Sequence, residues 1–555
     1  MGAEHPNPVV ADQTGHSSSL SRTPVSGICD GSSTAYIVLG LTGLTVIAKA
    51  LGFGEKLVIA HLFGTSPIAD SYFLVTTLVL SIGFLAKELI NPSLLPVMTD
   101  AARTSTVAAA SLCRSILVLV IAVTSPMAVL CITSPEAIIS VAAPGFDQER
   151  QQLAAHLLQW AGPAVMILGL TAVTRTALHS NGRFFAVSLS ETAAKAAFIV
   201  GILALVPVLG ARGGAIAFAV SALLCLLLQM GLVSRPLGLS AILSSGWRSR
   251  GHLKRVLRLA APLCVGVLLS HVGDLVDNAF ASRLHAGELS YVNYSKRLMD
   301  ACLLIMAAPL VTVWFTKAAS LAARGQLSTL HDTVSRAARL LAFVAVPVSI
   351  LLVKLREPLV ACLFQHGQFG AGSTAGTAQA LALFACGFPA QALDGLIVAT
   401  FFALSNTRLP VAAGAIGVGV NIVLVIVLID VIGFSAIPLA TSVTKTAKVV
   451  VLVLLLRKAL TGCVCPAKAT WVFLAKLSCA SLAMWAVVEG LATTESTTFW
   501  ATAGRGVALP ALTAVAAYGA VAVLAGMPEI ATISSILRRL VTGKAVRPVT
   551  HPDVP

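Results

Sequence analysis

The sequence predicts an all-α integral membrane protein of about fourteen transmembrane helices, in two six-helix bundles with two extra C-terminal helices. The first observation is composition: of 555 residues, 57% are hydrophobic and only 11% are charged, and the mean hydropathy is +0.90. Soluble proteins carry about 25% charged residues. The second observation is that the apolar residues form blocks of the ~20 residues needed to cross a bilayer. The third is an internal repeat.

The apolar blocks predict the number and type of spans. Within lipid, only helices and closed barrels satisfy their backbone hydrogen bonds, and the two-residue alternation of barrel strands is absent. We therefore expect helical spans, which cover approximately residues 35–53, 68–96, 114–133, 153–178, 184–208, 213–233, 258–282, 298–319, 338–356, 376–404, 409–430, 434–456, 470–490 and 506–527.

The distribution of lysine and arginine predicts the orientation. When both termini are placed in the cytoplasm, the inside connections carry 23 of these residues and the outside connections carry 9. This excess agrees with the positive-inside rule. Because membrane topology accounts for most of the net charge of +15, we expect no nucleic-acid partner.

The second part of the chain repeats the first at an offset of about 220 residues. Ser-Asn-x-Arg at 180–183 recurs at 405–408, and the apolar stretch 215–221 recurs loosely at 436–442. Six spans per repeat give two halves of the same orientation, related by an axis along the membrane normal. Two such bundles facing each other would enclose a central cavity.

These patterns predict the domain organisation. Residues 1–33 are polar and lack the basic and apolar regions of a signal peptide, so we expect no removable leader. The predicted parts are a disordered cytoplasmic tail (1–33), an N-terminal bundle (34–233), a basic cytoplasmic loop (234–257), a C-terminal bundle (258–458), helices 13 and 14 (459–527) and a basic cytoplasmic tail (528–555).

Ionisable residues inside the predicted spans are candidates for function, because they are costly in a bilayer unless they face a cavity or a partner. Lys49 lies in the first span, and Asp70, Lys87 and Glu88 lie in the second. Glu191 and Lys195, one helical turn apart in the fifth span, are expected to neutralise each other as an ion pair.

Asp274 and Asp277 lie three residues apart on one face of the seventh span. Two such carboxylates cannot both stay charged without a proton, a cation or a basic partner. One interpretation is a site that couples transport to a monovalent cation or proton. The other is structural pairing with a lysine such as Lys445 or Lys448.

Arg297 lies at the outer start of the eighth span, just before Asp300. Its planar guanidinium matches phosphate oxygens and stays charged when partly buried. A pyrophosphate head group entering an apolar vestibule would need such a partner, and Lys49 could supply a second positive charge. The alternative is that Arg297 reaches the interface and pairs with Asp300.

Several short stretches occur in a fixed order along the chain. They are Ala-Lys-Ala-Leu-Gly-Phe (48–53), Ala-His-Leu-Phe-Gly (60–64), Ala-Asp-Ser-Tyr-Phe (69–73), Ala-Pro-Gly-Phe (143–146), Asn-Gly-Arg-Phe (181–184), Tyr-Ser-Lys-Arg-Leu-Met-Asp (294–300) and Leu-Phe-Gln-His-Gly-Gln-Phe (363–369). This ordered set resembles the MurJ/MviN family, whose corresponding patterns include Ser-Arg-x-Leu-Gly-Phe and Leu-Phe-x-x-Gly-x-Phe.

The resemblance implies the fold of the multidrug/oligosaccharidyl-lipid/polysaccharide exporters and a place in the bacterial inner (plasma) membrane. It also implies export of lipid II, the undecaprenyl-pyrophosphate-linked peptidoglycan precursor, for cell wall biogenesis and cell shape. The family positions thought to bind the substrate head group fall here on Lys49, Asp70, Glu88, Ser290, Arg297 and Asp300.

Three positions depart from the family pattern. Lys49 replaces an arginine, Glu55-Lys56 reverses an Arg-Asp pair, and Gly83-Phe84 stands near the place of two arginines. The loss of about three guanidinium groups from an anion-binding cavity bears on the identity of the substrate rather than on the fold. Lys87 could restore one positive charge.

The leading hypothesis is therefore a flippase for lipid II. The alternatives are a flippase for an exopolysaccharide or O-antigen repeat unit, which would suit the altered cavity charges, and a cation-coupled drug exporter. A membrane glycosyltransferase would need a large loop with acid/base or metal-binding groups, which the sequence lacks. We find no Gly-x-x-x-x-Gly-Lys-Ser/Thr and no His-Glu-x-x-His. We expect no catalysis, no cofactor and no metal.

Overall fold

The computed structural model describes residues 31–237, 250–460, 467–491 and 502–534, and within these ranges every regular element is helical. The first half contains α1 (Gly31–Phe63), α2 (Pro67–Thr104), α3 (Thr106–Thr133), α4 (Pro135–Ala142), α5 (Gln148–Ala161), α6 (Pro163–Ser180), α7 (Phe184–Leu209) and α8 (Ala211–Leu237). The second contains α10 (Arg250–Ala281), α11 (Glu288–Ala323), α12 (Leu327–Lys354), α13 (Arg356–Phe364), α14 (Ala371–Cys386), α15 (Phe388–Ala403), α16 (Arg408–Ile432), η1 (Gly433–Ser435) and α17 (Ala436–Ala459). After them come α18 (Ala467–Leu491), η2 (Thr502–Ala508) and α20 (Leu509–Leu524).

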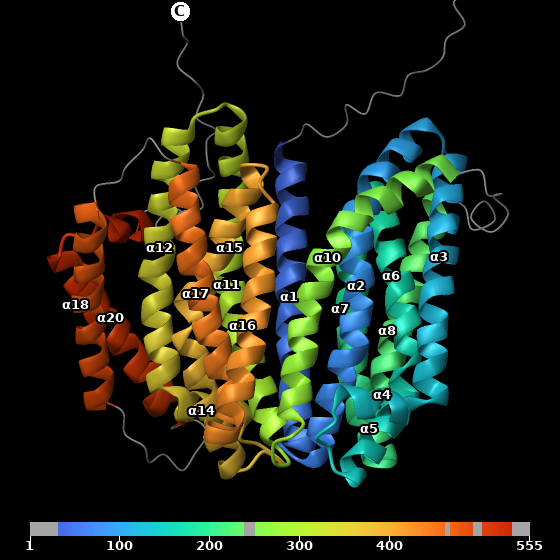
Figure 1. The fold of residues 1–555 in the computed structure, drawn as a ribbon, viewed down its shortest axis with the longest axis horizontal. Coiled ribbons are helices and arrows are strands. Elements are labelled where there is room, and N and C mark those ends of the chain that lie inside the picture. The colour runs from blue at the N-terminus through green and yellow to red at the C-terminus, as the bar shows by residue number, and fades with distance from the viewer. Residues whose placement is uncertain (1–30, 238–249, 461–466, 492–501, 535–555) are drawn as a thin grey trace, which may run out of the picture.

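Figure 1 shows the helices as two groups standing side by side. The helices from α2 to α8 lie on the right and those from α11 to α17 on the left, while α1 stands near the middle. α10 runs obliquely next to α2, and it packs against both α2 and α16. The first helix of the second half therefore bridges the two groups.

The predicted internal repeat is visible in the order and shape of the helices. α5 and α6 meet at a 41° bend around Gly162, and α14 and α15 meet at a 45° bend around Gly387. These glycines are 225 residues apart (387 − 162), the same offset as the repeated Ser-Asn-x-Arg motif. Gly210 and Gly433, which end α7 and α16, have nearly the same backbone angles, with φ of 60° and 58°. The two halves thus correspond element by element in this region.

Within the described residues, eight helical stretches are long and apolar enough to cross a membrane, or eleven if each of three bent pairs is one span. α1 and α10 are not among them, and α16 with α17 counts as one stretch, Arg408–Ala459. Its 52 residues would extend about 78 Å, more than twice the ~30 Å hydrocarbon thickness. α16 and α17 instead pack against each other. The chain is a multi-pass membrane protein, and the count of fourteen spans remains a prediction.

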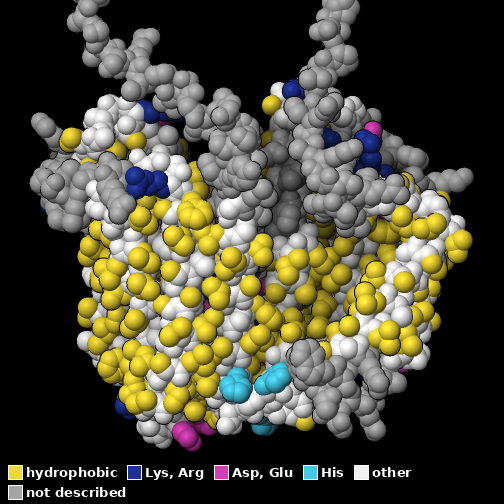
Figure 2. Space-filling view, turned by 180° about the vertical axis from the view of Figure 1, so that it is seen from behind, with side chains coloured by type: hydrophobic (Ala, Val, Ile, Leu, Met, Phe, Trp, Pro, Cys, Tyr) yellow, Lys and Arg dark blue, Asp and Glu magenta, His cyan; other side chains and the backbone are white. Residues whose placement is uncertain are grey.

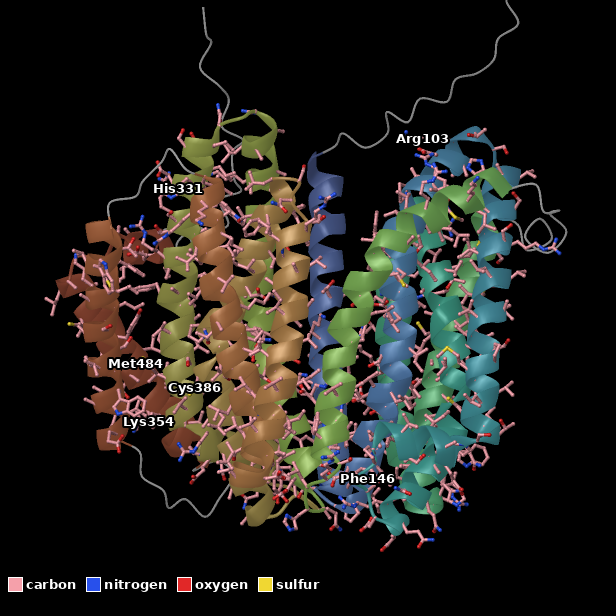
Figure 3. All side chains as sticks on the ribbon, viewed as in Figure 1. Arg103, Phe146, His331, Lys354, Cys386 and Met484 are labelled. Atoms are coloured by element: carbon pink, nitrogen blue, oxygen red, sulfur yellow. The ribbon has the colours of Figure 1, made fainter. Side chains whose placement is uncertain are left out.

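The two C-terminal helices, α18 and α20, pack on the outer side of the second half (Figure 1). The Tyr518 hydroxyl of α20 donates a 2.9 Å hydrogen bond to the carbonyl of Phe343 in α12. Lys354, labelled in Figure 3, lies 3.8 Å from the ring centroid of Trp485 and pairs with Glu489 of α18. These contacts attach the extra helices to α12.

The predicted domain boundaries remain predictions. α1 begins at Gly31 and α10 at Arg250, so helices extend into the segments expected to be a tail (1–33) and a loop (234–257). The rest of the predicted N-terminal tail, most of the predicted C-terminal tail (528–555) and residues 238–249 lie outside the described residues.

Candidate functional site

Asp70, in the first turn of α2, joins the two halves of the molecule. It is fully buried. Its Oδ2 accepts a 2.6 Å hydrogen bond from the backbone N–H of Gly287, and its Oδ1 accepts bonds from the N–H and hydroxyl of Ser290 at 2.8 and 2.5 Å. The first N–H groups of a helix lack intrahelical partners and favour negative charge. Asp70 thus caps α11 from the opposite half.

The backbones of the two halves approach closely beside this cap. Gly64 and Gly287 have φ of +55° and +94°, angles that glycine adopts at least cost. A Cβ on Gly64 would clash with the carbonyl oxygen of Gln368, and a Cβ on Gly287 would clash with that of Thr65. The Thr65 and Ser373 hydroxyls, again from opposite halves, lie 2.7 Å apart. Side chains larger than hydrogen at these glycines would force the halves apart.

An aromatic cluster around Tyr294 of α11 fills the space above these contacts. The Tyr294 ring centroid lies 4.9 Å from that of Phe73, 5.4 Å from that of Phe364 and 5.5 Å from that of Phe369. Its hydroxyl donates a 2.9 Å hydrogen bond to the carbonyl of Gly64. Because Tyr294 is fully buried among residues of both halves, this layer excludes water. We call this layer, with the Asp70 cap and the contacts beside it, the closed end.

The segment between α4 and α5 also belongs to the closed end. The backbone N–H of Gly145 donates a 3.1 Å hydrogen bond to the hydroxyl of Ser282, at the end of α10. The Arg150 guanidinium lies 4.8 Å from the ring centroid of Phe146, which Figure 3 labels at the lower end. Hydrogen bonds from the Arg150 backbone N–H and then its side chain lower the pKa of Asp147, which caps α5.

At the opposite end, Figure 2 shows the surface hollowed between the two halves. There Asp100 of α2 forms a 3.0 Å ion pair with Arg255 of α10, so the start of α10 stays with the first half. Arg103, labelled in Figure 3, marks the same end. Direct contacts of the first half with α11 and α14 are described at the closed end.

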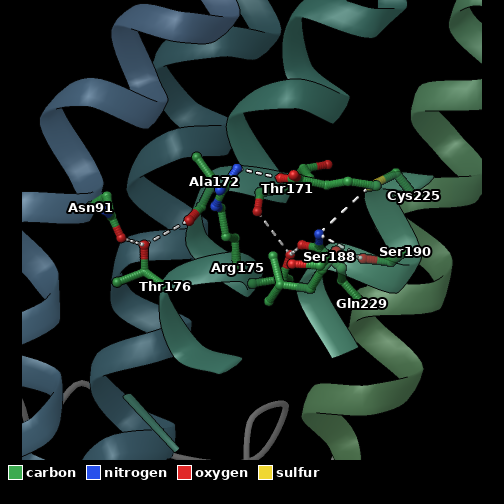
Figure 4. Close-up of polar contacts among 12 residues, drawn as sticks. Asn91, Thr171, Ala172, Arg175, Thr176, Ser188, Ser190, Cys225 and Gln229 are labelled. Carbon is green, nitrogen blue, oxygen red and sulfur yellow. Dashed lines mark hydrogen bonds and ion pairs between the residues drawn. The ribbon is translucent and has the colours of Figure 1, made fainter. Parts of the chain in front are cut away.

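A buried polar network fixes the helices of the first half (Figure 4). Gln229 of α8 accepts a 2.8 Å hydrogen bond from the Thr174 hydroxyl of α6 and donates one of 3.1 Å to the Ser190 hydroxyl of α7. Glu191, the next residue, forms an ion pair with Arg175 of α6. The expected pair between Glu191 and Lys195 is therefore wrong, because the network turns Glu191 toward α6.

Lys195 instead reaches α1. A Cβ on Gly52 would lie 2.5 Å from the Lys195 Nζ. Lys49 is exposed on the same side of α1, three residues earlier, and interacts electrostatically with Lys87 of α2. Lys87 also interacts with Arg175. We refer to Lys49, Lys87, Arg175 and Lys195 as the basic cluster.

The other predicted residues of the substrate site lie on α2 and α11. The Glu88 carboxylate is half exposed and lies 3.5 Å from Nε2 of His271 in α10. The same Nε2 has no hydrogen-bond partner, so the contact is an ion pair only when His271 is protonated. Arg297 lies one turn beyond Tyr294 and is half-buried, without an ion-pair or hydrogen-bond partner among the described residues. No described ion pair joins it to Asp300, which has another interaction.

The structure therefore separates the predicted substrate residues into two groups. Asp70 and Ser290 bind each other in the closed end, whereas the other four, Lys49, Glu88, Arg297 and Asp300, take no part in that contact. Whether any of them contacts a substrate stays a prediction. Because Asp70 is buried in the closed end, it does not face the central cavity expected from the two bundles in this conformation.

The two residues predicted to couple transport to an ion, Asp274 and Asp277, lie on α10. Asp277 of α10 accepts a 2.9 Å hydrogen bond from the side-chain amide of Asn421 in α16. The side chain of Asp274 lies outside the described part of the structure. Lys448, one of the two lysines considered as structural partners, pairs at 2.8 Å with Asp394 of α15 instead.

Comparison with known proteins decides the family. A family model described as Lipid II flippase MurJ matches residues 59–503. The chain belongs to this family. The MurJ relatives include the lipid II flippase of Burkholderia cenocepacia, 25% identical over 436 residues that cover 76% of this chain and 83% of the relative. A probable lipid II flippase from Buchnera aphidicola subsp. Schizaphis graminum is 24% identical over 375 residues, which cover 66% of this chain and 72% of the relative.

Solved structures share the fold. A MurJ lipid II flippase in an inward closed conformation matches with a TM-score of 0.74 and 21% identity, covering 90% of this chain and 99% of the other. An inward-facing multidrug transporter of the MATE family matches with a TM-score of 0.66 and 14% identity, covering 75% and 94%. The exporter fold inferred from the family resemblance is confirmed.

Five of the short stretches that resemble the MurJ family contribute residues to the closed end. One residue from each of these stretches takes part in the contacts described above: Gly64, Asp70, Gly145, Tyr294 and Phe369. The sequence placed these residues in the family pattern without indicating that they meet. Sequence reasoning did not find Arg175 as the partner of Glu191 or Gly52 as the neighbour of Lys195. The residues around a side chain in the sequence do not predict which other helix it faces.

Proposed function

We propose that this chain is a flippase that moves lipid II across the membrane by alternating access. The observation that carries this proposal is the match to the MurJ family model over residues 59–503. The family is one of transporters rather than enzymes. The geometry agrees with transport, because a molecule sealed at one end and hollowed at the other admits a polar head group from one side only.

The closed end then faces the outside. The excess of lysine and arginine in the connections at the other end supports this orientation, with both termini on the cytoplasmic side of a bacterial inner membrane. The head group would enter from the cytoplasmic side while the polyprenyl chain stays in lipid. Release would require the Asp70 cap and the Tyr294 cluster to separate.

The predicted substrate residues take different roles in this scheme. Arg297, Lys49, Glu88 and Asp300 would contact the saccharide-pyrophosphate head group, with Arg297 closest to the seal. Asp70 and Ser290 would hold the outer side shut until the head group is bound, since their hydrogen bonds exist only while the halves touch.

We also propose a monovalent cation or proton site at Asp277. The Asn421 amide bonds Asp277 through nitrogen and leaves its own buried Oδ1 without a hydrogen-bond partner. A Cβ on Gly417, one turn before Asn421, would lie 3.6 Å from Cγ2 of Thr444, whose buried hydroxyl also has no partner. Oxygen atoms of a carboxylate, an amide and a hydroxyl suit a hard cation.

An exopolysaccharide or O-antigen flippase is not favoured, because the relatives above carry the lipid II assignment. The likeness to multidrug transporters concerns the fold alone.

The experiment is complementation of a strain depleted of its lipid II flippase, beside lipid II translocation by the purified protein in proteoliposomes. We expect both growth and translocation. Failure of both, with loss of an exopolysaccharide in a deletion strain, would contradict the lipid II assignment and support the alternative substrate.

A further inference from the structure

An apolar groove lies between helices of the two halves, and we call it the lateral groove. It has a volume of about 550 Å³. Asn278 is the one polar side chain among the described residues that line it. Its walls include Leu74 and Leu78 of α2, Leu130 of α3, Ile138 of α4 and Leu275 of α10.

The lateral groove is open on the surface that faces lipid. Two of its wall residues are largely exposed, Val141 by 81% and Leu130 by 51%, whereas Leu74 and Leu78 are buried and form its floor. Apolar cavities do not hold water, and an empty one forfeits the dispersion contacts of its lining. In a protein surrounded by lipid, a hydrocarbon chain is the occupant that this lining suits.

The size of the lateral groove distinguishes a single chain from a helix of another protein. An α-helix with its side chains is about 10–12 Å wide and rises about 5.4 Å in each turn, so that one turn fills roughly 400–600 Å³. The groove would therefore accept only about one turn of a partner helix. One hydrocarbon chain fits this space better.

Arg283 lies at the mouth of the lateral groove, where two of its walls end. It follows Ala279 of the α10 wall by four residues, and its backbone lies against Gly145, three residues after Ala142 of the α4 wall. A Cβ on Gly145 would stand 2.5 Å from the Arg283 Cα.

The Arg283 side chain is exposed and available to an anion. Its guanidinium lies 5.3 Å from the ring centroid of Phe280 and has no ion-pair or hydrogen-bond partner among the described residues. The acidic residue of the α4–α5 segment, Asp147, is already paired with Arg150. An arginine at the end of a membrane span stands at the level of the lipid head groups, and its planar fork matches phosphate oxygens.

We propose that the lateral groove binds a membrane phospholipid, with one acyl chain between α2, α4 and α10 and the phosphate group on Arg283. Because the walls come from both halves, the lipid bridges them in the closed conformation. The site does not depend on the proposed function, since the phospholipid is a component of the bilayer and not the transported substrate.

The test uses phosphatidylglycerol with a photoreactive diazirine in the middle of one acyl chain, in nanodiscs that contain the full chain. Mass spectrometry after irradiation identifies the labelled residues. We expect labelling of Leu74 and Leu78, because only a chain inside the groove reaches these buried side chains. Labelling confined to exposed residues such as Val123 would overturn the site. Stronger labelling of the groove by undecaprenyl phosphate with the same diazirine would overturn the phospholipid assignment in favour of a polyprenyl chain.

Two substitutions fill the lateral groove from opposite walls. Ala142→Trp in α4 and Ala279→Trp in α10 should each reduce the labelling of Leu78 at least fivefold. Ala122→Trp is the matched control, because Ala122 is exposed on α3 and does not line the groove. Unchanged labelling in both groove variants, or an equal loss in the control, would contradict binding in the groove.

The head-group contact is tested at Arg283. Arg283→Gln should reduce labelling of Leu78 by phosphatidylglycerol at least threefold, and Arg283→Lys should keep most of it, since lysine retains the charge. Equal labelling in the wild type and Arg283→Gln would contradict the phosphate contact.

Cross-linking tests whether the lateral groove belongs to the closed conformation. The Thr65 and Ser373 hydroxyls lie 2.7 Å apart, so a Thr65→Cys/Ser373→Cys variant can be oxidised to hold the halves together at this end. The oxidised variant should show wild-type labelling of Leu78. Loss of labelling in this form would contradict a lipid site built from both halves in the closed state.

Discussion

The closed end and the basic cluster differ in whether their polar and charged side chains have partners within the protein. In the closed end, the buried Asp70 carboxylate meets three donors from the other half, and Tyr294 meets a carbonyl. In the basic cluster, Lys195 has no such partner among the described residues. Groups with partners in the protein stabilise one conformation, whereas a charge without such a partner is a candidate for binding a ligand. This difference separates residues that hold the closed conformation from residues that are candidates for binding the substrate.

The largest effect is expected for Arg297→Ala, which removes the half-buried guanidinium of a candidate substrate-binding residue. Lipid II translocation in proteoliposomes should be abolished, while thermal stability stays near that of the wild type because no described partner is lost. Arg297→Lys should retain part of the activity, since lysine keeps the charge but loses the planar fork. Normal translocation by Arg297→Ala would remove this residue from the binding group.

Asp70→Asn tests whether the Asp70 cap holds the closed end together. The amide nitrogen must face one of the three donors, so the cap of α11 loses charge-assisted bonds worth about 1.5–3 kcal/mol each. We expect translocation to fall at least tenfold and the amides of residues 282–294 to exchange hydrogen faster. Unchanged exchange there would show that the cap does not hold the closed end.

Gly287→Ala tests the same end through its backbone. A Cβ would clash with the Thr65 carbonyl, and φ of +94° is unfavourable for alanine. We expect faster exchange at residues 61–66 and a severalfold loss of translocation. Gly372→Ala is the control, because its Cβ would meet nothing within 4 Å; a similar loss in both variants would argue against a specific contact.

Asp277→Asn tests a third region, where we propose a site for a monovalent cation or proton beside the unpartnered Oδ1 of Asn421. The variant should reduce the dependence of translocation on monovalent cations or protons by severalfold while lowering the basal rate less. The measurement is the rate across sodium and pH series. An unchanged dependence in both series would place coupling elsewhere.

Tyr294→Phe should have the smallest effect. It removes one hydrogen bond to the Gly64 carbonyl, worth about 1 kcal/mol, and keeps the ring packing. We expect a change in translocation of fivefold or less. A complete loss of activity would mean that the hydroxyl does more than help to close this end.

The sequence predicted the helical class, the internal repeat and the family, because apolar blocks and short motifs are runs of neighbouring residues. It predicted Asp70 and Ser290 as one functional group, but not that they bind each other 220 residues apart (290 − 70). It also paired Glu191 with Lys195 by helical spacing, whereas Gln229 and its neighbours turn Glu191 to Arg175. Spacing along one helix cannot reveal a competing partner on another helix.

Covalent linkage across the closed end tests most directly whether that end must open. The hydroxyls of Thr65 and Ser373 lie 2.7 Å apart in opposite halves, so a Thr65→Cys/Ser373→Cys variant should form a disulfide on mild oxidation. Each single variant controls for the native cysteines. We predict that the oxidised double variant translocates no lipid II and recovers after reduction. Translocation at the wild-type rate with the disulfide intact would contradict alternating access through this end.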